Sequence, residues 1–243
     1  MIIALQEEFR LLKEGADLIG ISLSRQNLEN MISFLELLQR RNRRKNLIGT
    51  KGSQKIIIRH FLDCLAPLSL ESIPSGGPVL DIGSGAGLPG FLWSLARPDI
   101  DFYLLDSRQS RIDFIRSSVN KLDIHNCFPI AERAEILGDD PDFREKFNFV
   151  TARAVARAGV VLEYALPLVR VSGQVGLYKG PNYREELKTA AGVAEKMGGS
   201  EIIVRKIDVP YLEEERYFLI SKKVEKTPER FPRSVGVPEK RPL

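Results

Sequence analysis

The segment VLDIGSGAGLPG, residues 79–90, carries the most specific chemical pattern in this chain of 243 residues. An apolar run ends in Asp81, and three glycines follow at alternate positions before a helical stretch begins: Gly83, Gly85, Gly87 and then Leu88. Glycines at such a junction let the backbone turn tightly and let a ligand approach it closely. In an open parallel sheet this junction is where ligands bind, so we expect the segment to line a cofactor site.

Two classes of ligand compete for this loop. Gly85, Gly87 and Gly90 satisfy the G-x-G-x-x-G pattern of dinucleotide sites, which alone is a weak match. The loop also fits D-x-G-x-G-x-G, the pattern of S-adenosylmethionine sites, in which the glycines lie against the methionine portion. Asp81 favours this second ligand, because a carboxylate there would repel a pyrophosphate but can hold an amino group, directly or through water. A tight turn without any ligand is the third alternative.

Acidic residues follow the next two apolar runs. Asp106 ends FYLLD, 19 residues after Gly87, where a carboxylate can accept both hydroxyls of a ribose. It supports a ribose-bearing cofactor without distinguishing S-adenosylmethionine from NAD, and an ordinary helix cap is the alternative. Ala134 and Glu135 follow the next expected strand, where an adenine would lie. Glu135 could accept a hydrogen bond from the exocyclic amine, and a solvated side chain is its alternative role.

The elements that must position these residues alternate from Pro78 onward. Strands are predicted at 79–81, 102–106, 127–131, 147–152 and 173–178, and helices at 89–97, 108–121, 160–169 and 183–197. Two late strands, 201–209 and 216–222, are separated by a short acidic loop and can pair antiparallel. The alternation predicts an α/β fold: a mostly parallel sheet with an antiparallel last strand and helices on both faces.

Three segments of different character divide the chain. Residues 1–70 form a predicted N-terminal helical extension, in which Ser24 can cap a helix. Residues 71–224 form the predicted cofactor-binding domain, and the stretch SIPSGGP, 72–78, marks the boundary. Residues 225–243 form a basic tail whose prolines predict no regular structure: Pro228, Pro232, Pro238 and Pro242.

The charge of the chain is distributed unevenly. Lys and Arg total 36 against 32 Asp and Glu, a net charge of +4. Eight basic residues and no acidic one lie between Arg40 and His60, and seven basic against three acidic residues lie from Lys222 onward. The remainder is therefore acidic. Two basic zones point to a polyanion such as nucleic acid, although solubilising helix ends explain them equally well.

The cysteine content and the apolar runs indicate the cellular compartment. Two cysteines, Cys64 and Cys127, allow neither a disulfide framework nor a zinc cluster, and they suit a reducing compartment. No apolar run approaches the ~18 residues of a membrane span, and Glu7 and Glu8 stand where a signal peptide would be basic or apolar. We expect a cytoplasmic protein without a metal site and without membrane association.

Over nearly its whole length the chain resembles the bacterial small-subunit (16S) ribosomal RNA guanine-N7 methyltransferases, also called glucose-inhibited division protein B. The glycine motif is generic to S-adenosylmethionine enzymes. Five blocks are more specific and occur in the family's order: RHFLD (59–63), GLPG (87–90), LLDS (104–107), ARA (152–154) and YKG (178–180). The resemblance implies a Rossmann-like class I methyltransferase fold and methyl transfer from S-adenosylmethionine to N7 of one guanine.

The resemblance also implies which residues act. Cofactor contacts would fall on Gly83, Leu88, Ala134, Glu135 and Arg153, with Asp81 and Asp106 less securely matched. Guanine N7 has a lone pair and no proton, so no general base is required, and three residues are candidates for positioning: Arg153, Lys179 and His60. A buried His60 bonded to a backbone carbonyl and a solvated Lys179 at a strand end are the alternatives. The predicted RNA contacts are Arg40, Arg41, Arg43, Arg44, Lys45, Arg59, Lys179, Arg230 and Arg233.

The partner expected from this interpretation is small-subunit ribosomal RNA or a ribosomal subunit, bound by a monomer. Two other functions stay open at this point. The chain could methylate another substrate, with the basic zones incidental. It could also be a ribosome-assembly protein that binds RNA and has a vestigial cofactor loop.

Overall fold

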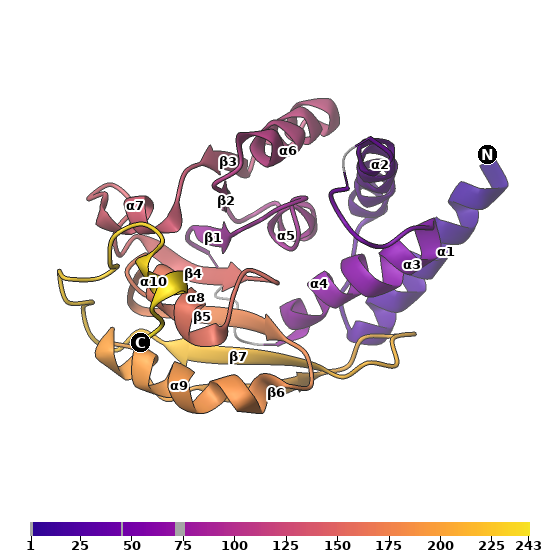
Figure 1. Ribbon diagram of the computed structural model, residues 1–243. Helices are drawn as coiled ribbons and strands as arrows, with labels where there is room; N and C mark the ends of the chain where they lie inside the picture. Colours follow the sequence, from indigo (N-terminus) through magenta and orange to yellow (C-terminus); the bar gives the residue numbers. More distant parts are fainter. Residues whose placement is uncertain (1, 45, 71–75) are drawn as a thin grey trace.

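A computed structural model describes residues 2–44, 46–70 and 76–243. At its centre is a seven-stranded sheet in the order β3-β2-β1-β4-β5-β7-β6 (Figure 1). The strands are β1 Val79–Ile82, β2 Phe102–Asp106, β3 Cys127–Ala131, β4 Phe147–Ala152, β5 Val169–Lys179, β6 Ile203–Ile207 and β7 Arg216–Lys222. Strands β1 to β5 pair in parallel, and β7 runs antiparallel to both β5 and β6. The mostly parallel sheet with an antiparallel last strand is therefore confirmed.

Helices cover both faces of the sheet, as expected for buried parallel strands. They are α5 Gly90–Ala96, α6 Gln109–Leu122, α7 Ala134–Asp139, α8 Ala158–Ala165 and α9 Tyr183–Lys196. Successive residues of one strand enter different apolar clusters: Phe149 packs with the α5 and α6 side, and Val150 with the α8 and α9 side. Side chains of a strand point alternately to its two faces, so each strand contributes to both cores.

The N-terminal helices pack on the α5 and α6 side of the sheet (Figure 1). They are α1 Ile2–Ile19, α2 Arg25–Asn42, α3 Ser53–Ile56 and α4 Asp63–Leu65, with a π-helical turn at Ile57–Leu62 and a 3-10 turn at Ala66–Ser69. The Ser24 hydroxyl accepts from the Asn27 amide at 3.1 Å, which confirms the predicted cap. Phe34 of α2 stacks on Phe91 of α5 with ring centroids 4.3 Å apart, so this segment shares a core with the sheet.

The structure departs from the expected elements in three places. The helix predicted over 160–169 ends at Ala165, and Val169 begins the long strand β5. Helix α7 was not predicted. The prediction that the tail has no regular structure is wrong, because Val237–Lys240 forms the short helix α10. Pro238 lies in the first turn of α10, where no intrahelical amide hydrogen is needed and proline is tolerated.

The tail lies against the sheet domain. Phe231 is buried, and the Arg144 guanidinium donates to the carbonyls of Phe231 and Thr227 at 2.8 and 3.1 Å.

The predicted domain boundary at residue 70 stays a prediction, since residues 71–75 fall outside the described residues. Among the helices that the structure describes, none is long and apolar enough to cross a membrane.

Candidate functional site

The loop after β1 has the conformation that its glycines permit. Gly83, Gly85 and Gly87 have φ angles of 69°, 55° and 89°, in the left-handed region that favours glycine. A Cβ on Gly83 would lie 2.5 Å from Cγ2 of Val155. The backbone conformation therefore favours glycine at all three positions, and the close approach of the loop after β4 requires it at Gly83 as well.

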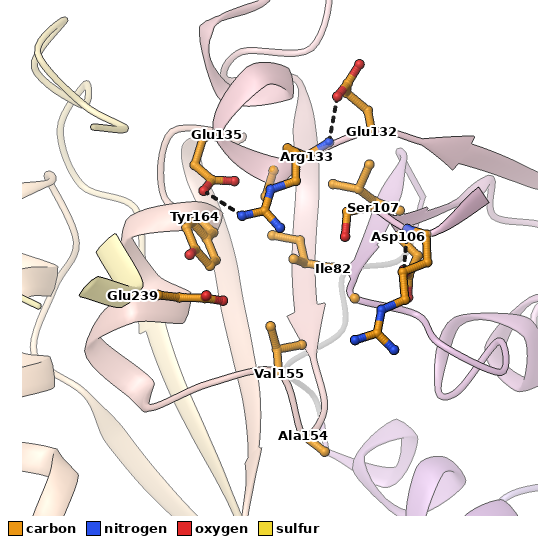
Figure 2. Close-up of a pocket in the computed structure, with 14 residues that line it drawn as sticks. Ile82, Asp106, Ser107, Glu132, Arg133, Glu135, Ala154, Val155, Tyr164 and Glu239 are labelled. Carbon is orange, nitrogen blue, oxygen red and sulfur yellow. Dashed lines mark hydrogen bonds and ion pairs between the residues drawn. The ribbon is translucent and has the colours of Figure 1, made fainter. Parts of the chain in front are cut away.

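Two neighbouring hollows open at the carboxyl ends of β1, β2 and β4. One of about 240 Å³ is lined by residues from the loops after β1, β2, β3 and β4, and Figure 2 shows it. The second, of about 300 Å³, lies between the glycine loop and the N-terminal helices. Both are lined by Gly83, Asp106, Arg108 and Ala154, so they form adjoining parts of one site. This is the edge of a parallel sheet at which ligands bind.

Asp106 lies at the junction of the two hollows. Its Oδ2 accepts from the Gly85 amide and its Oδ1 from the Arg108 amide, both at 2.9 Å. Each carboxylate oxygen has a second lone pair with which it can accept another hydrogen bond. The position fits the predicted ribose contact, and the two amides hold the carboxylate in place for it.

Asp81 lies beneath the glycine loop rather than at the surface of either hollow. Its side chain is 1% exposed, and Oδ2 accepts from the Gly90 amide at 2.9 Å. No hydrogen-bond partner reaches Oδ1 from the described residues. Burial raises the pKa of Asp81 to about 7. The structure thus gives Asp81 a role in holding the loop to α5, and its contact with a cofactor amino group stays a prediction.

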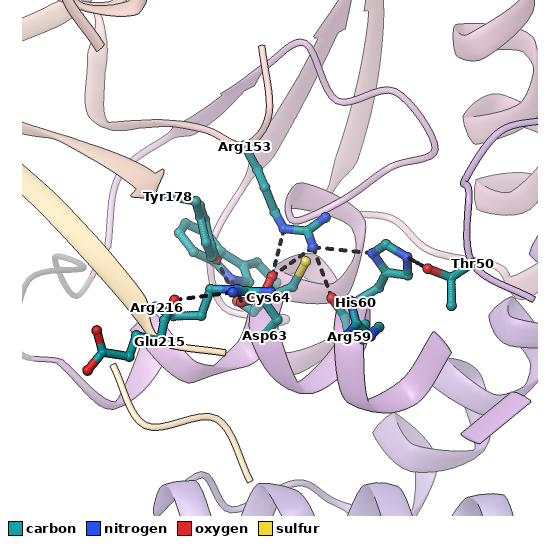
Figure 3. A network of polar contacts seen from close by, with 10 residues as sticks. Thr50, Arg59, His60, Asp63, Cys64, Arg153, Tyr178, Glu215 and Arg216 are labelled. Carbon is teal, nitrogen blue, oxygen red and sulfur yellow. Dashed lines mark hydrogen bonds and ion pairs between the residues drawn. The ribbon is translucent and has the colours of Figure 1, made fainter. Parts of the chain in front are cut away.

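Arg153 connects the second hollow to a buried polar network, drawn in Figure 3. Its Nε and Nη2 donate to Asp63 Oδ2 at 2.9 and 2.7 Å, and Nη2 also donates to the Arg59 carbonyl at 3.0 Å. Asp63, 3% exposed, accepts from Arg216 at 3.1 Å through its other oxygen. One carboxylate from the N-terminal segment therefore orients two arginines from β-strand ends.

His60 belongs to the same network and lines the second hollow. Its Nδ1 lies 3.2 Å from Arg153 Nη2, and its Nε2 lies 2.9 Å from Thr50 Oγ1. A guanidinium can only donate, so Nδ1 accepts and the ring proton sits on Nε2, which donates to Thr50. Burial, then the charges of Arg153 and Arg59, lower the pKa of His60 to about 4. The imidazole is therefore neutral near pH 7, and both nitrogens are engaged.

Four of the predicted RNA contacts gather at the end of α2. Arg40, Arg41, Arg43 and Arg44 line a hollow of about 470 Å³ between α2 and α6, together with Lys121. The Arg40 side chain is 74% exposed and lies 3.7 Å from Glu36. Lys45 lies outside the described residues. The structure thus presents a cationic surface at the predicted place.

Two other predicted RNA contacts, Arg59 and Lys179, have intramolecular partners. Arg59 pairs with Glu214, and Lys179 donates to Glu186 at 2.8 Å and to the Ala156 carbonyl at 3.1 Å. Lys179 lines neither hollow of the site. The role of these residues in RNA binding or in positioning stays a prediction.

The tail arginines differ from each other. Arg233 donates twice to Glu163, through Nε and Nη2 at 2.7 Å each, and the Glu163 side chain is 1% exposed. Arg230 is exposed and lies over the Phe231 ring at 5.2 Å. Arg233 therefore anchors the tail, whereas Arg230 faces solvent. Their contacts with RNA stay predictions.

Several residues of the site escaped the sequence analysis. Asp63 was visible in the RHFLD block, yet nothing local indicated that it would meet Arg153 and Arg216. The residues that close the first hollow are Arg133, Tyr164 and Glu239, and the sequence alone assigned none of them to the cofactor site.

The comparisons with known proteins agree with this geometry. The family model described as GidB, rRNA small subunit methyltransferase G, matches residues 27–213. The chain belongs to this family. Ribosomal RNA small subunit methyltransferase G of Desulforamulus reducens is 35% identical over 96% of this chain and 97% of its own length. The protein of the same name from Carboxydothermus hydrogenoformans is 38% identical over 92% of this chain and 95% of its own length.

Solved structures show the fold class. TYW2 of M. jannaschii, in complex with AdoMet, matches with a TM-score of 0.52 at 15% identity, over 73% of this chain and 79% of that one. A SAM dependent methyltransferase from Aquifex aeolicus also gives 0.52, at 16% identity, over 70% and 93%. The domain has the Rossmann-like class I methyltransferase fold, and family membership makes it an S-adenosylmethionine-dependent enzyme.

Proposed function

We propose that this protein transfers a methyl group from S-adenosylmethionine to N7 of a guanine in 16S ribosomal RNA. The observation that carries the proposal is family membership over residues 27–213, joined to a hollow at the carboxyl ends of β1, β2 and β4. The relatives named above are small-subunit ribosomal RNA methyltransferases. The protein would act in the cytoplasm as a monomer, on ribosomal RNA or on a ribosomal subunit.

The residues present fit the methyl donor. Gly83 and Gly85, with Leu88, line the second hollow and offer a backbone cradle for the methionine portion, and a Cβ on Gly83 would collide with Val155 there. Asp106 offers two fixed oxygens to the ribose hydroxyls. The adenine would lie in the first hollow beside Ala134 and Glu135, and Arg153 would face the methionine carboxylate in the second: both arrangements are our assignment of these residues. When bound, the donor supplies an electrophilic methyl group on a positively charged sulfur.

The chemistry at guanine N7 requires no proton transfer from the nucleophile, because N7 carries a lone pair and no hydrogen. His60, the imidazole at the site, is neutral and uses both ring nitrogens in hydrogen bonds, so it is not placed to act as a general base. Catalysis would then depend on holding the base in line with the methyl group, an effect of position and orientation. Arg153 and His60 would keep the wall of the hollow rigid for that purpose.

RNA would be attracted by the cationic surface at the end of α2, which lies on the side of the N-terminal helices (Figure 1). Arg108 and Arg111 line the second hollow itself and could meet phosphates nearest the target base. Binding through such contacts is independent of sequence and weakens steeply with salt.

Methyl transfer with labelled S-adenosylmethionine onto small ribosomal subunits tests the proposal, followed by digestion of the RNA and analysis of its bases. Labelled N7-methylguanine is the expected product. Label that stays off RNA would favour another substrate, and label on a ribose or an exocyclic nitrogen would refute the N7 assignment. Absence of any transfer together with tight binding of RNA would favour a ribosome-assembly protein.

A further inference from the structure

The C-terminal tail forms one wall of the hollow in which we place the adenine. Arg233 is tied to the buried Glu163 by two hydrogen bonds of 2.7 Å, and the Gly236 amide donates to Glu135 Oε1 at 2.8 Å. Helix α10 follows directly and carries Glu239 into the lining of the hollow. In Figure 2 the Glu239 side chain extends toward the interior, between Tyr164 and Val155.

Two polar groups in this hollow lack a partner among the described residues. One is the hydroxyl of Tyr164, a residue that is 4% exposed, and the other is Nε of Arg133. Burial, then the charges of Glu135 and Glu239, raise the pKa of Tyr164, so its hydroxyl keeps its proton and can donate. Buried polar groups in native proteins are nearly always hydrogen-bonded, so a ligand that accepts from these donors is expected here.

The two carboxylates of the hollow are not equivalent. Glu135 is 3% exposed, and its Oε1 already accepts from Gly236 and lies 3.6 Å from Arg133 Nη2. Glu239 is exposed and extends from the tail into the hollow. Glu135 therefore holds the tail in place, and Glu239 is the carboxylate that the tail presents to a ligand.

Adenine has the matching edge, with an exocyclic amine that donates and ring nitrogens that accept. We propose that the tail completes the adenine subsite and that Glu239 accepts a hydrogen bond from the exocyclic amine, which makes it a specificity-determining residue. This inference rests on the proposed function, because it assigns the first hollow to the adenine of S-adenosylmethionine. It moves to Glu239 the contact that the sequence suggested for Glu135.

Calorimetry with two ligands tests the inference without measuring activity. One ligand is S-adenosylhomocysteine, and the other is its deaminated analogue, S-inosylhomocysteine, in which a keto oxygen replaces the amine. Glu239→Ala should bind S-adenosylhomocysteine about tenfold more weakly, the loss expected for one hydrogen bond to a charged group. Its affinity for the deaminated analogue should change little, so the ratio of the two affinities, which measures the preference for adenine, should fall. Glu239→Gln, whose amide can also donate to the keto oxygen, should narrow that preference as well.

Lys240→Ala, an exposed neighbour on α10, is the matched control and should bind both ligands as the wild type does. Unchanged affinities in Glu239→Ala would overturn the inference. Tighter binding by that variant would overturn it as well, because the carboxylate would then obstruct the hollow. Equal weakening of both ligands would also overturn it, because Glu239 would then not distinguish the amine from the keto oxygen. A wild-type protein that binds neither ligand would instead refute the cofactor site of the proposed function.

Discussion

Oδ2 of Asp63 accepts two hydrogen bonds from Arg153, at 2.9 and 2.7 Å, across 90 residues of sequence. Its other oxygen accepts from Arg216. The carboxylate is 3% exposed, and the Arg153 side chain is 17% exposed. A buried charge in such a network is costly to leave without its partner, because water cannot replace the lost contact.

Asp63→Asn should therefore lower the free energy of unfolding by about 3–5 kcal/mol, since two guanidinium groups lose their counter-ion. Urea unfolding measures the change. Asp99→Asn is the matched control, because Asp99 pairs with Arg97 on the surface with its side chain 58% exposed, and it should cost under about 1 kcal/mol. Equal costs for the two variants would contradict the network's importance.

His60→Gln should reduce methyl transfer less than about tenfold at saturating S-adenosylmethionine, because His60 does not act as a general base. Loss of a general base would reduce the rate about 10²- to 10⁴-fold. Burial lowers the pKa of His60 to about 4, so the wild-type rate should also show no step near pH 6.5. Rates over pH 5.5 to 8, with RNA and cofactor both saturating, measure this. A hundredfold loss accompanied by such a step would mean that His60 accepts a proton in the reaction.

The raised pKa of Asp81 predicts a pH-dependent stability. Burial raises it from 3.8 to about 7, so between these values the folded protein holds a proton that the unfolded chain has released. The free energy of unfolding of the wild type should fall, relative to Asp81→Asn, as pH rises from about 4 to about 7, and then level off. Urea titrations across this range measure the difference. Asparagine keeps the acceptor for the Gly90 amide. If the two proteins show the same dependence of unfolding free energy on pH, the pKa of Asp81 is not raised.

Arg233→Ala should destabilise the fold, because Glu163 would keep a buried charge with no counter-ion. The expected loss is about 3–5 kcal/mol in the free energy of unfolding. Arg230→Ala, on the same tail but exposed, is the control and should stay within about 0.5 kcal/mol. If Arg233→Ala unfolds like the wild type and only weakens RNA binding, the predicted RNA contact is its main role.

Replacing Arg40, Arg43 and Arg44 together by Ala should weaken RNA binding. If each meets one phosphate, the slope of log K against log salt should become shallower by about 2 to 3. Lys188→Ala with Lys196→Ala, exposed positions of α9, is the control pair. Filter binding of a ribosomal RNA fragment at several salt concentrations measures both, and an unaltered slope in the triple variant would remove the α2 end from the RNA surface.

Much of the site was predictable because it depends on neighbours in the chain. Left-handed φ angles at Gly83, Gly85 and Gly87 follow from the tight turn after one strand, and Asp106 reaches the loop because it ends the adjacent strand. Short apolar runs predicted the bounds of β2, β3, β4 and β7 to the residue, because strands that pack against a core are rich in apolar residues. The cap at Ser24 is equally local.

Partner choice over long distances was decided only by the tertiary structure. A lysine or arginine has the same appearance in a sequence whether it faces RNA or a buried carboxylate, so the pairs Lys179–Glu186 and Arg233–Glu163 could not be foreseen. Packing of the tail brought Gly236 to Glu135, 101 positions away, and so placed Glu239 at the hollow. Charge and propensity are properties of one residue and its neighbours, whereas burial and hydrogen-bond geometry belong to the folded chain.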